Sequence, residues 1–294
     1  MEKEVIGRED YLDLLDKNTN SFKKGTAKSI ALLGSRKSGK TSIIKKHLKN
    51  VKDIVPVYID LEKIRLNPEN FSIEFIGNIM FHFLRKPLND YKKFLLLENL
   101  LKFEDELKSK NAFSLVKTIE NELLKIKPDQ KLLVETAFKF AETLGKDTNK
   151  KFLIALDNFE NLLDLNNFSQ IKDILSIINF DSQYTGYIVA SSLVKQSLHL
   201  LKNLDCYEIK NLEKKEAFGL IEIILGKNEK AAQEIFDLSN GHPLITILIS
   251  KKYKGTKDVK KAFLIELLQK DNSIYNYCND SLNYYYNMAR GQTL

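Results

Sequence analysis

The chain has 294 residues, of which 43% are hydrophobic and 29% charged, and its formal net charge is +7, a balance typical of a globular protein with a sizeable core. No apolar run approaches the roughly 18 to 20 residues of a membrane-spanning helix, and the first four residues are too charged to begin a signal peptide. The 2 cysteines and 4 scattered histidines exclude a disulfide framework and show no zinc-ligand spacing, so we expect a cytoplasmic protein without a membrane partner.

Residues 34–41 have the G-x-x-x-x-G-K-T pattern of a phosphate-binding loop. The apolar residues 29–33 before them predict a buried strand, and residues 42–48 after them predict an amphipathic helix. In that setting backbone N–H groups surround the phosphates, the lysine reaches the β- and γ-phosphates, and the threonine hydroxyl, here Thr41, ligates Mg²⁺. The predicted contacts of ATP or ADP are Gly34, Ser35, Arg36, Lys37, Ser38, Gly39, Lys40, Thr41 and Ser42.

Four further strands are predicted after the loop. They are residues 54–60, 152–156, 187–190 and 206–209. Most are short, apolar on both faces and separated by helical patterns, as in a parallel sheet that is covered by helices. We therefore predict an α/β fold in which a five-stranded parallel sheet is sandwiched by helices, with the ligand at the carboxyl ends of the strands.

Helical patterns alone fill two regions, and single helices are expected in the other connections. The first region is an insertion at about residues 68–149, with predicted helices at 71–84, 91–109, 113–126 and 130–144. The second has predicted helices at 214–225, 229–238, 243–253 and 259–269. The predicted domains are thus an ATPase core at 1–211, a helical lid at 212–270 and an aromatic-rich tail, helical in pattern, at 271–294.

The residues after the third and fourth strands complete the predicted site. Asp157 is the predicted second ligand of Mg²⁺, acting directly or through water. Asn158 follows it, and an amide cannot accept a proton, so we expect slow hydrolysis if Asn158 occupies the place that positions the attacking water. Glu160 is then the candidate base, unless it is an exposed residue of a helical first turn. Ser191 and Ser192 would place a hydroxyl near the γ-phosphate, or simply end their strand.

With these residues placed, the chain resembles, over nearly its whole length, the AAA+ and STAND class of P-loop ATPases. It is most similar to the archaeal ATPase family with a C-terminal helical lid. Residues 5–9, V-I-G-R-E, are similar to a family segment near the adenine, which implies nucleotide contacts for Ile6, Gly7 and Arg8. The sequence G-H-P at 241–243 resembles a lid motif, which implies that His242 and Pro243 contact the base or sugar. By itself this segment predicts only a helix start.

The resemblance also places Ser191 and Ser192 at the family's first sensor, and three departures from the family pattern limit the expected catalysis. Most relatives carry Glu at the place of Asn158, although NACHT-type relatives have a small residue there and an acid further on, which residues 157–160 partly resemble. No arginine lies between the fourth strand and the lid, since the chain's arginines are Arg8, Arg36, Arg65, Arg85 and Arg290. Residues 270–294 are too few for the winged-helix domain of many relatives.

These features favour a nucleotide-dependent switch with weak ATPase activity that associates with a protein partner or with itself. A second hypothesis is a DNA-associated ATPase of the replication-initiator or transposition-regulator type. The charge of +7 fits a nucleic-acid partner, but it is spread over many helices and no recognition helix is evident. A third is a degenerate ATPase that holds its nucleotide permanently. The aromatic tail favours packing on the lid or on a partner over base stacking.

Overall fold

The computed structural model describes residues 6–25 and 29–290; Val5 of the N-terminal motif and residues 291–294 of the predicted tail lie outside the described residues. The described chain divides into two compact units. The first, called here the sheet unit, comprises residues 11–25, 29–34 and 40–208. The second, the helical unit, comprises residues 6–10, 35–39 and 209–290. The phosphate-binding loop therefore contributes its ends to the sheet unit and its middle to the helical unit.

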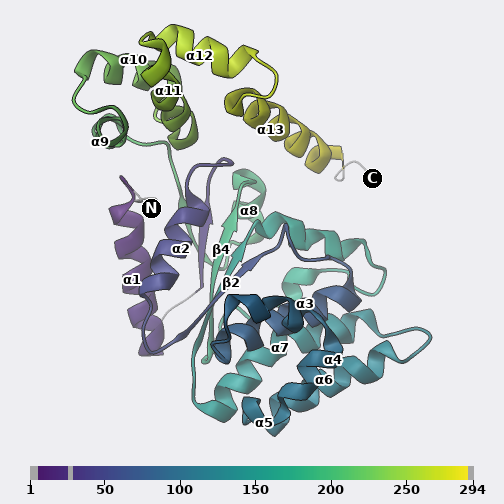
Figure 1. The fold of residues 1–294 in the computed structure, drawn as a ribbon. Coiled ribbons are helices and arrows are strands. Elements are labelled where there is room, and N and C mark those ends of the chain that lie inside the picture. Colours follow the sequence, from purple (N-terminus) through teal and green to yellow (C-terminus); the bar gives the residue numbers. More distant parts are fainter. Residues whose placement is uncertain (1–5, 26–28, 291–294) are drawn as a thin grey trace. The chain divides into compact units, whose positions relative to one another are not determined.

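A five-stranded parallel sheet with the order β2-β3-β4-β1-β5 forms the centre of the sheet unit (Figure 1). The strands are β1 (Ile30–Leu33), β2 (Val55–Asp60), β3 (Phe152–Asp157), β4 (Thr185–Ser191) and β5 (Asp205–Glu208). Every residue of β1 and β3 is buried, as expected for strands that are covered on both faces. The predicted α/β class and the five predicted strands are confirmed, with ends that differ by one or two residues.

Two helices, α1 (Glu9–Lys23) and α2 (Lys40–Asn50), lie side by side in Figure 1. They are joined by a buried histidine of α2: His47 Nδ1 lies 2.7 Å from Asp16 Oδ1, and its Nε2 lies 2.9 Å from Thr19 Oγ1. Burial lowers the pKa of His47, while the carboxylate of Asp16 opposes that shift. The sequence analysis did not predict α1. A third helix, α8 (Val194–Leu200), connects β4 to β5.

The insertion between β2 and β3 contains three helices that are longer than its other elements: α3 (Pro68–Phe83), α6 (Lys110–Leu123) and α7 (Gln130–Thr148). Side-chain caps fix where they begin: Asn67 accepts the N–H of Asn70, Ser109 that of Ala112 and Asp129 that of Leu132. Fully buried rings fill the space between α3 and α7. They are Phe71 and Phe75, which contact Phe138 at centroid distances of 5.6 and 4.8 Å.

The single helix predicted for residues 91–109 is wrong. Four short pieces replace it, namely η1 (Leu88–Leu95), α4 (Leu97–Leu100), η2 (Leu101–Phe103) and α5 (Glu104–Leu107). The backbone is extended at Leu96, with φ −123° and ψ 123°. This break lets the chain fold back, so that the rings of Phe94 and Phe103 stack at 4.6 Å. Tertiary packing of the two rings here overrides helix propensity.

The helix expected between β3 and β4 is also wrong. The connection consists of 3₁₀ turns, η3 (Phe159–Asn167) and η4 (Ile174–Ser176). It starts at Asn158, whose φ of 55° lies in the left-handed region. Buried apolar side chains such as Leu162 and Leu165 then hold the connection against the core of the sheet unit. The sharp turn and this anchoring leave no room for a regular helix.

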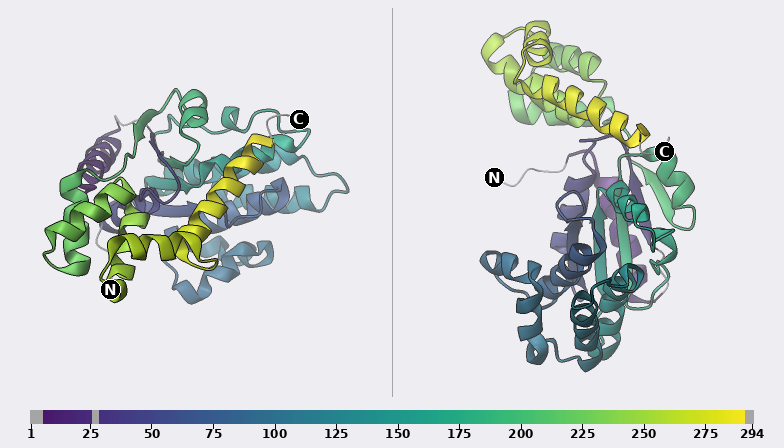
Figure 2. Two further views of the ribbon diagram at one scale, coloured as in Figure 1. Left: turned by 90° about the horizontal axis from the view of Figure 1, so that it is seen from above. Right: turned by 90° about the vertical axis from the view of Figure 1, so that its right-hand side faces the viewer.

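Five helices make up most of the helical unit: α9 (Lys214–Leu225), α10 (Glu229–Ser239), α11 (Pro243–Thr256), α12 (Val259–Leu268) and α13 (Ser273–Arg290). The turned views in Figure 2 show these helices packed on one another, and no strand is described among them. They share a small core that includes Ile221, Ile235 and Ile249. The predicted C-terminal helical region is confirmed. Among the residues that the structure describes, no helix combines the length and apolarity needed to cross a membrane.

We predict that Gly77→Ala lowers the free energy of unfolding by about 3 kcal/mol, because an added Cβ would lie 1.8 Å from the main-chain oxygen of Phe94. Urea unfolding followed by circular dichroism at 222 nm measures the effect. The matched control is Gly219→Ala in α9, where a Cβ meets nothing within 4 Å and alanine should stabilise the helix slightly. An unchanged urea midpoint for Gly77→Ala would contradict the close packing of α3 on η1.

Candidate nucleotide-binding site

The phosphate-binding loop leaves the sheet at Gly34, directly after β1. Its N–H donates to the main-chain oxygen of Ser191 at 3.2 Å, which ties the start of the loop to the end of β4. At the other end of the loop, Lys40 begins α2 and its Nζ donates to the Gly34 carbonyl oxygen at 2.7 Å. The Lys40 side chain thus bends back to the end of β1, where the oxygens of a bound phosphate would meet the ammonium. Ser42, on the first turn of α2, is exposed.

The middle of the loop, residues 35–39, has a backbone that suits an anion. Gly39 has φ 108°, which side chains rarely adopt, and this explains the glycine. Ser35 and Lys37 are exposed, and the Ser38 N–H closes a turn on the Ser35 oxygen at 3.2 Å. The Ser38 hydroxyl is buried and has no hydrogen-bond partner within the described part of the chain. Because such a group costs about 1–3 kcal/mol when unsatisfied, an added phosphate acceptor fits this loop.

Thr41 and Asp157 meet at the carboxyl edge of the sheet. Thr41 Oγ1 donates to Asp157 Oδ2 at 2.6 Å, and the Tyr58 hydroxyl donates to the same oxygen at 2.8 Å. The Asn158 N–H donates to the other carboxylate oxygen at 3.1 Å. Burial and the charge of Asp157 raise the pKa of Tyr58, so it stays protonated as a donor. A hydroxyl and one carboxylate are the protein ligands that a nucleotide-bound Mg²⁺ uses, so these residues fit that ion.

Glu160 is buried, with 3% of its surface exposed, so the exposed-residue interpretation is wrong. Its carboxylate accepts the Ser192 hydroxyl at 2.5 Å and the Ser192 N–H at 3.3 Å. The pair links the start of η3 to the end of β4. Ser191, the last residue of β4, bonds through its hydroxyl to Ser197 Oγ at 2.7 Å. The strand order confirms that β4 lies between β1 and β3, where a sensing hydroxyl is expected.

Within the helical unit, the N-terminal motif contacts the middle of the loop. The guanidinium of Arg8 is buried and donates to the Ser38 main-chain oxygen at 3.0 Å. Gly7 has φ 65°, and a Cβ there would lie 2.6 Å from the side chain of Glu216. Ile6 is half-buried. Arg8 therefore supports the shape of the loop, while contact of these residues with adenine stays a prediction.

The G-H-P segment reaches the same loop. His242 Nε2 lies 3.2 Å from the main-chain oxygen of Arg36, and Pro243 begins α11. Two tyrosines of α13, which the sequence analysis did not assign to the site, join them. Tyr277 donates its hydroxyl to the same oxygen at 3.2 Å, and the Arg36 guanidinium lies 4.3 Å from the centroid of the Tyr284 ring. The aromatic richness of the tail was the only sequence signal for these contacts.

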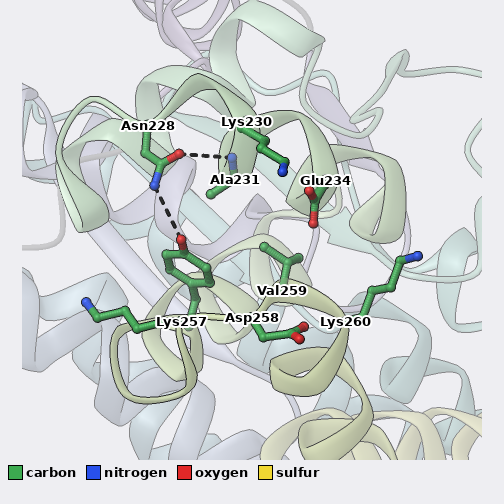
Figure 3. Close-up of a pocket in the computed structure, with 9 residues that line it drawn as sticks. Asn228, Lys230, Ala231, Glu234, Lys257, Asp258, Val259 and Lys260 are labelled. Carbon is green, nitrogen blue, oxygen red and sulfur yellow. Dashed lines mark hydrogen bonds between the residues drawn. The ribbon is translucent and has the colours of Figure 1, made fainter.

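A separate surface pocket of about 550 Å³ belongs to the helical unit (Figure 3). It is lined by Asn228, Lys230, Ala231, Glu234, Tyr253, Lys257, Asp258, Val259 and Lys260. Much of its polar lining already serves the fold, because Asn228 caps α10 and Asp258 caps α12. Three lysines and two carboxylates give the lining a small positive net charge. None of these nine residues belongs to the predicted nucleotide site.

No protein-family model matches this chain, and neither does any curated protein. Similarity is found among solved structures. A Walker-type ATPase of Pyrococcus abyssi is 16% identical with a TM-score of 0.57, over 98% of this chain and 75% of that one. The ORC2 protein of Aeropyrum pernix, in its ADPNP–ADP complexes, is 12% identical with a TM-score of 0.53, over 90% of this chain and 68% of that one.

At these identities the similarity is one of fold. The chain has the α/β fold of the P-loop ATPases of AAA+ type, with a parallel five-stranded sheet and a C-terminal helical region. The resemblance seen in the sequence is confirmed at this level.

We predict that Asp157→Asn reduces the Mg²⁺ dependence of nucleotide binding, because the neutral amide keeps the size of the side chain but removes the charge beside Thr41. Titration of a fluorescent ATP analogue with Mg²⁺ or with EDTA should show a large Mg²⁺ enhancement in the unchanged protein and at least about tenfold less in the variant. Tyr58→Phe, which removes only a hydrogen bond to the same oxygen, is the control. An equal Mg²⁺ response in Asp157→Asn would refute the assignment.

Proposed function

We propose that the protein is an ATP-binding molecular switch with slow, Mg²⁺-dependent ATP hydrolysis to ADP and phosphate. Its nucleotide state would rearrange the lid relative to the core and control association with a protein partner or with a second copy of the chain. The observation that carries the proposal is the 2.6 Å hydrogen bond between Thr41 Oγ1 and Asp157 Oδ2, which are 116 positions apart. The loop hydroxyl and the strand-end carboxylate are thus adjacent, as ATP binding with Mg²⁺ requires.

Binding follows from groups already in place. The Lys40 ammonium would exchange the Gly34 carbonyl oxygen for oxygens of the β- and γ-phosphates, gaining charge-assisted hydrogen bonds. Backbone N–H groups of the loop and of the first turn of α2 would complete the cradle. Thr41 and Asp157 would hold Mg²⁺, which supplies neutralisation of phosphate charge when bound.

Slow hydrolysis follows from the groups around the attacking water. Asn158 carries an amide, which orients water but does not take its proton. Glu160 accepts two hydrogen bonds from Ser192, and these would have to be given up before Glu160 could act as a base. The sequence also has no arginine between β4 and α9 to stabilise the transition state. Each of these features removes a part of the rate enhancement that fast P-loop enzymes use.

The contacts of Arg36 support the switch. Its main-chain oxygen is shared by His242 and Tyr277, and its side chain lies over Tyr284. Phosphate entry turns loop N–H groups inward, which moves the carbonyl of the same peptide segment and so changes what α11 and α13 contact. Part of α13 is apolar and exposed, with Leu282 at 71% and Tyr286 at 59% exposure, a surface on which a partner chain can be gained or lost.

The DNA-associated alternative has one observation in its favour. Lys230, Lys257 and Lys260 line the pocket of Figure 3. Lys230 and Lys260 lie at the starts of α10 and α12, whose N-terminal dipoles also favour phosphate. Glu234 and Asp258 among them reduce the net charge. This alternative requires salt-dependent binding of duplex DNA that changes when ATP is exchanged for ADP. Absence of such binding near 50 mM salt would remove it.

We predict that Lys40→Ala abolishes ATP binding, because the ammonium that would neutralise the phosphates is removed. Isothermal titration with ATP and Mg²⁺ should show a loss of affinity of at least about 100-fold, on the order of 3 kcal/mol or more. Lys46→Ala, which changes an exposed lysine six residues further along α2, should bind ATP as the unchanged protein does. Micromolar affinity retained in Lys40→Ala would refute the site.

For the switch, we predict that the solution mass differs between nucleotide states. Light scattering should show a larger particle with ATP and Mg²⁺ than with ADP if the chain associates with itself, and Lys40→Ala should show no difference. ATP turnover measured with and without duplex DNA in the same samples separates the two functions, since only the alternative predicts stimulation. Tightly held ADP in the purified protein, with no exchange and no turnover, would contradict the switch and support a permanently bound nucleotide.

A further inference from the structure

Asp60, at the end of β2, lies beside the predicted magnesium ligand on the neighbouring strand. β2 and β3 are paired in parallel, and the pairing sets Asp60 opposite Asp157. Asp60 Oδ1 accepts a 2.8 Å hydrogen bond from the side-chain amide of Asn158, the residue that follows Asp157. The sequence analysis did not single out Asp60, because nothing in its local pattern distinguishes it from any acid that ends a strand.

The rest of the environment of Asp60 leaves its carboxylate partly accessible. The side chain is 14% exposed. Its Oδ1 also accepts the N–H of Glu62 at 3.2 Å, and Oδ2 lies 3.1 Å from Lys63 Nζ. Lys63 is 76% exposed, so this ion pair is a surface contact that water screens and that can open at little cost. Glu160, in contrast, is buried and engaged by Ser192.

Asn158 and Asp60 together form an amide and carboxylate pair across the edge of the sheet. A residue directly after a strand-end magnesium ligand is well placed to meet a water at the γ-phosphate, but an amide at that position only orients the water. The carboxylate that the reaction needs is on the next strand, hydrogen-bonded to that same amide. The ends of the two strands together supply both groups: the amide directly after β3 orients the water, and the carboxylate at the end of β2 can accept its proton.

We propose that Asp60 is the catalytic carboxylate of the slow ATPase, acting on the attacking water together with Asn158; this rests on the proposed function. The water oxygen forms a bond to the γ-phosphorus while the bond from that phosphorus to the β,γ-bridging oxygen breaks, and the bridging oxygen leaves with the electron pair on ADP. The proton of the water passes to the Asp60 carboxylate and from there to solvent, so ATP and water give ADP, phosphate and a proton.

The test measures binding and chemistry separately. Asp60→Asn keeps the size of the side chain and an oxygen for the Asn158 amide, so ATP affinity should stay within about threefold. The single-turnover hydrolysis rate should fall about 100-fold, the range that a positioned general base supplies. Glu62→Gln, an exposed acid two residues further on, is the matched control and should hydrolyse ATP at the unchanged rate. Glu160→Gln is the competing candidate, and a larger loss there than in Asp60→Asn would overturn the proposal.

A double variant, Asp60→Asn with Asn158→Asp, guards against a merely structural effect. It moves the carboxylate to the other strand and keeps one amide and one carboxylate in the pair; aspartate also tolerates the φ of 55° at position 158. Hydrolysis should recover at least about tenfold relative to Asp60→Asn. Failure to recover, with unchanged ATP affinity and thermal stability, would show that Asp60 does not act through its carboxylate.

The failures of the two proposals are distinguishable. If the unchanged protein binds ATP but shows no turnover, hydrolysis and the role of Asp60 are both refuted while nucleotide binding stands. If the unchanged protein hydrolyses ATP and Asp60→Asn does so equally fast, only the role of Asp60 is refuted. If ATP does not bind at all, the proposed function itself is overturned.

Discussion

Parallel strand pairing is the constraint on which the rest of the structure depends. β1, β4, β3 and β2 run in one direction in register, so their carboxyl ends form a single edge. That edge places Gly34 beside Ser191 and Asp60 beside Asp157. Because the two faces of such a sheet must be covered, the same constraint requires the helical connections and explains why a helical insertion as long as residues 68–149 packs without exposing the strands.

The second requirement is a sharp turn where the chain leaves that edge. After β3 the turn is made by Asn158 in the left-handed region, at a cost of about 1 kcal/mol that asparagine tolerates better than most residues. The turn directs the Asn158 N–H to the Asp157 carboxylate and its side chain to Asp60. Directly before α2, the loop has a positive φ of 108° at Gly39, which glycine adopts without strain because it has no Cβ. At Asn158 the left-handed backbone therefore orients polar groups of the candidate site.

Much of the sheet unit was predictable, because its signals are local. Apolar runs gave the five strands, the loop pattern gave residues 34–41, and an acid after a buried strand gave Asp157 as the partner of Thr41. The elements that the sequence did not predict correctly depend on tertiary packing. The break at Leu96 depends on the stacking of Phe94 on Phe103, and α1, which buries Leu15 and Phe22, consists mostly of polar residues.

The polar contacts of the site also include some that the sequence predicts and some that only the tertiary fold reveals. Thr41 and Asp157 belong to motifs whose spacing carries the information, so sequence was enough to pair them. The burial of Glu160 depends on where β4 places Ser192, and the bond of Tyr277 to Arg36 depends on the packing of α13. Composition and periodicity contain neither fact. They show which residues are polar or aromatic, and only the tertiary fold decides which polar groups meet.

The hydrogen bond between Asp60 and Asn158 changes the interpretation of the amide that follows Asp157. Neighbouring strands lie about 4.8 Å apart, so a carboxylate moved from one strand to the next stays within side-chain reach of the same point. Considered along β3 alone, Asn158 indicates a site without a proton acceptor, whereas the edge of the sheet still carries one. Asp60 Oδ1 accepts the Asn158 amide at the edge of the sheet, and Oδ2 lies against Lys63 at the surface. Both oxygens of this carboxylate therefore already have partners, which fits the slow hydrolysis that we propose for a sequence without an arginine between β4 and α9.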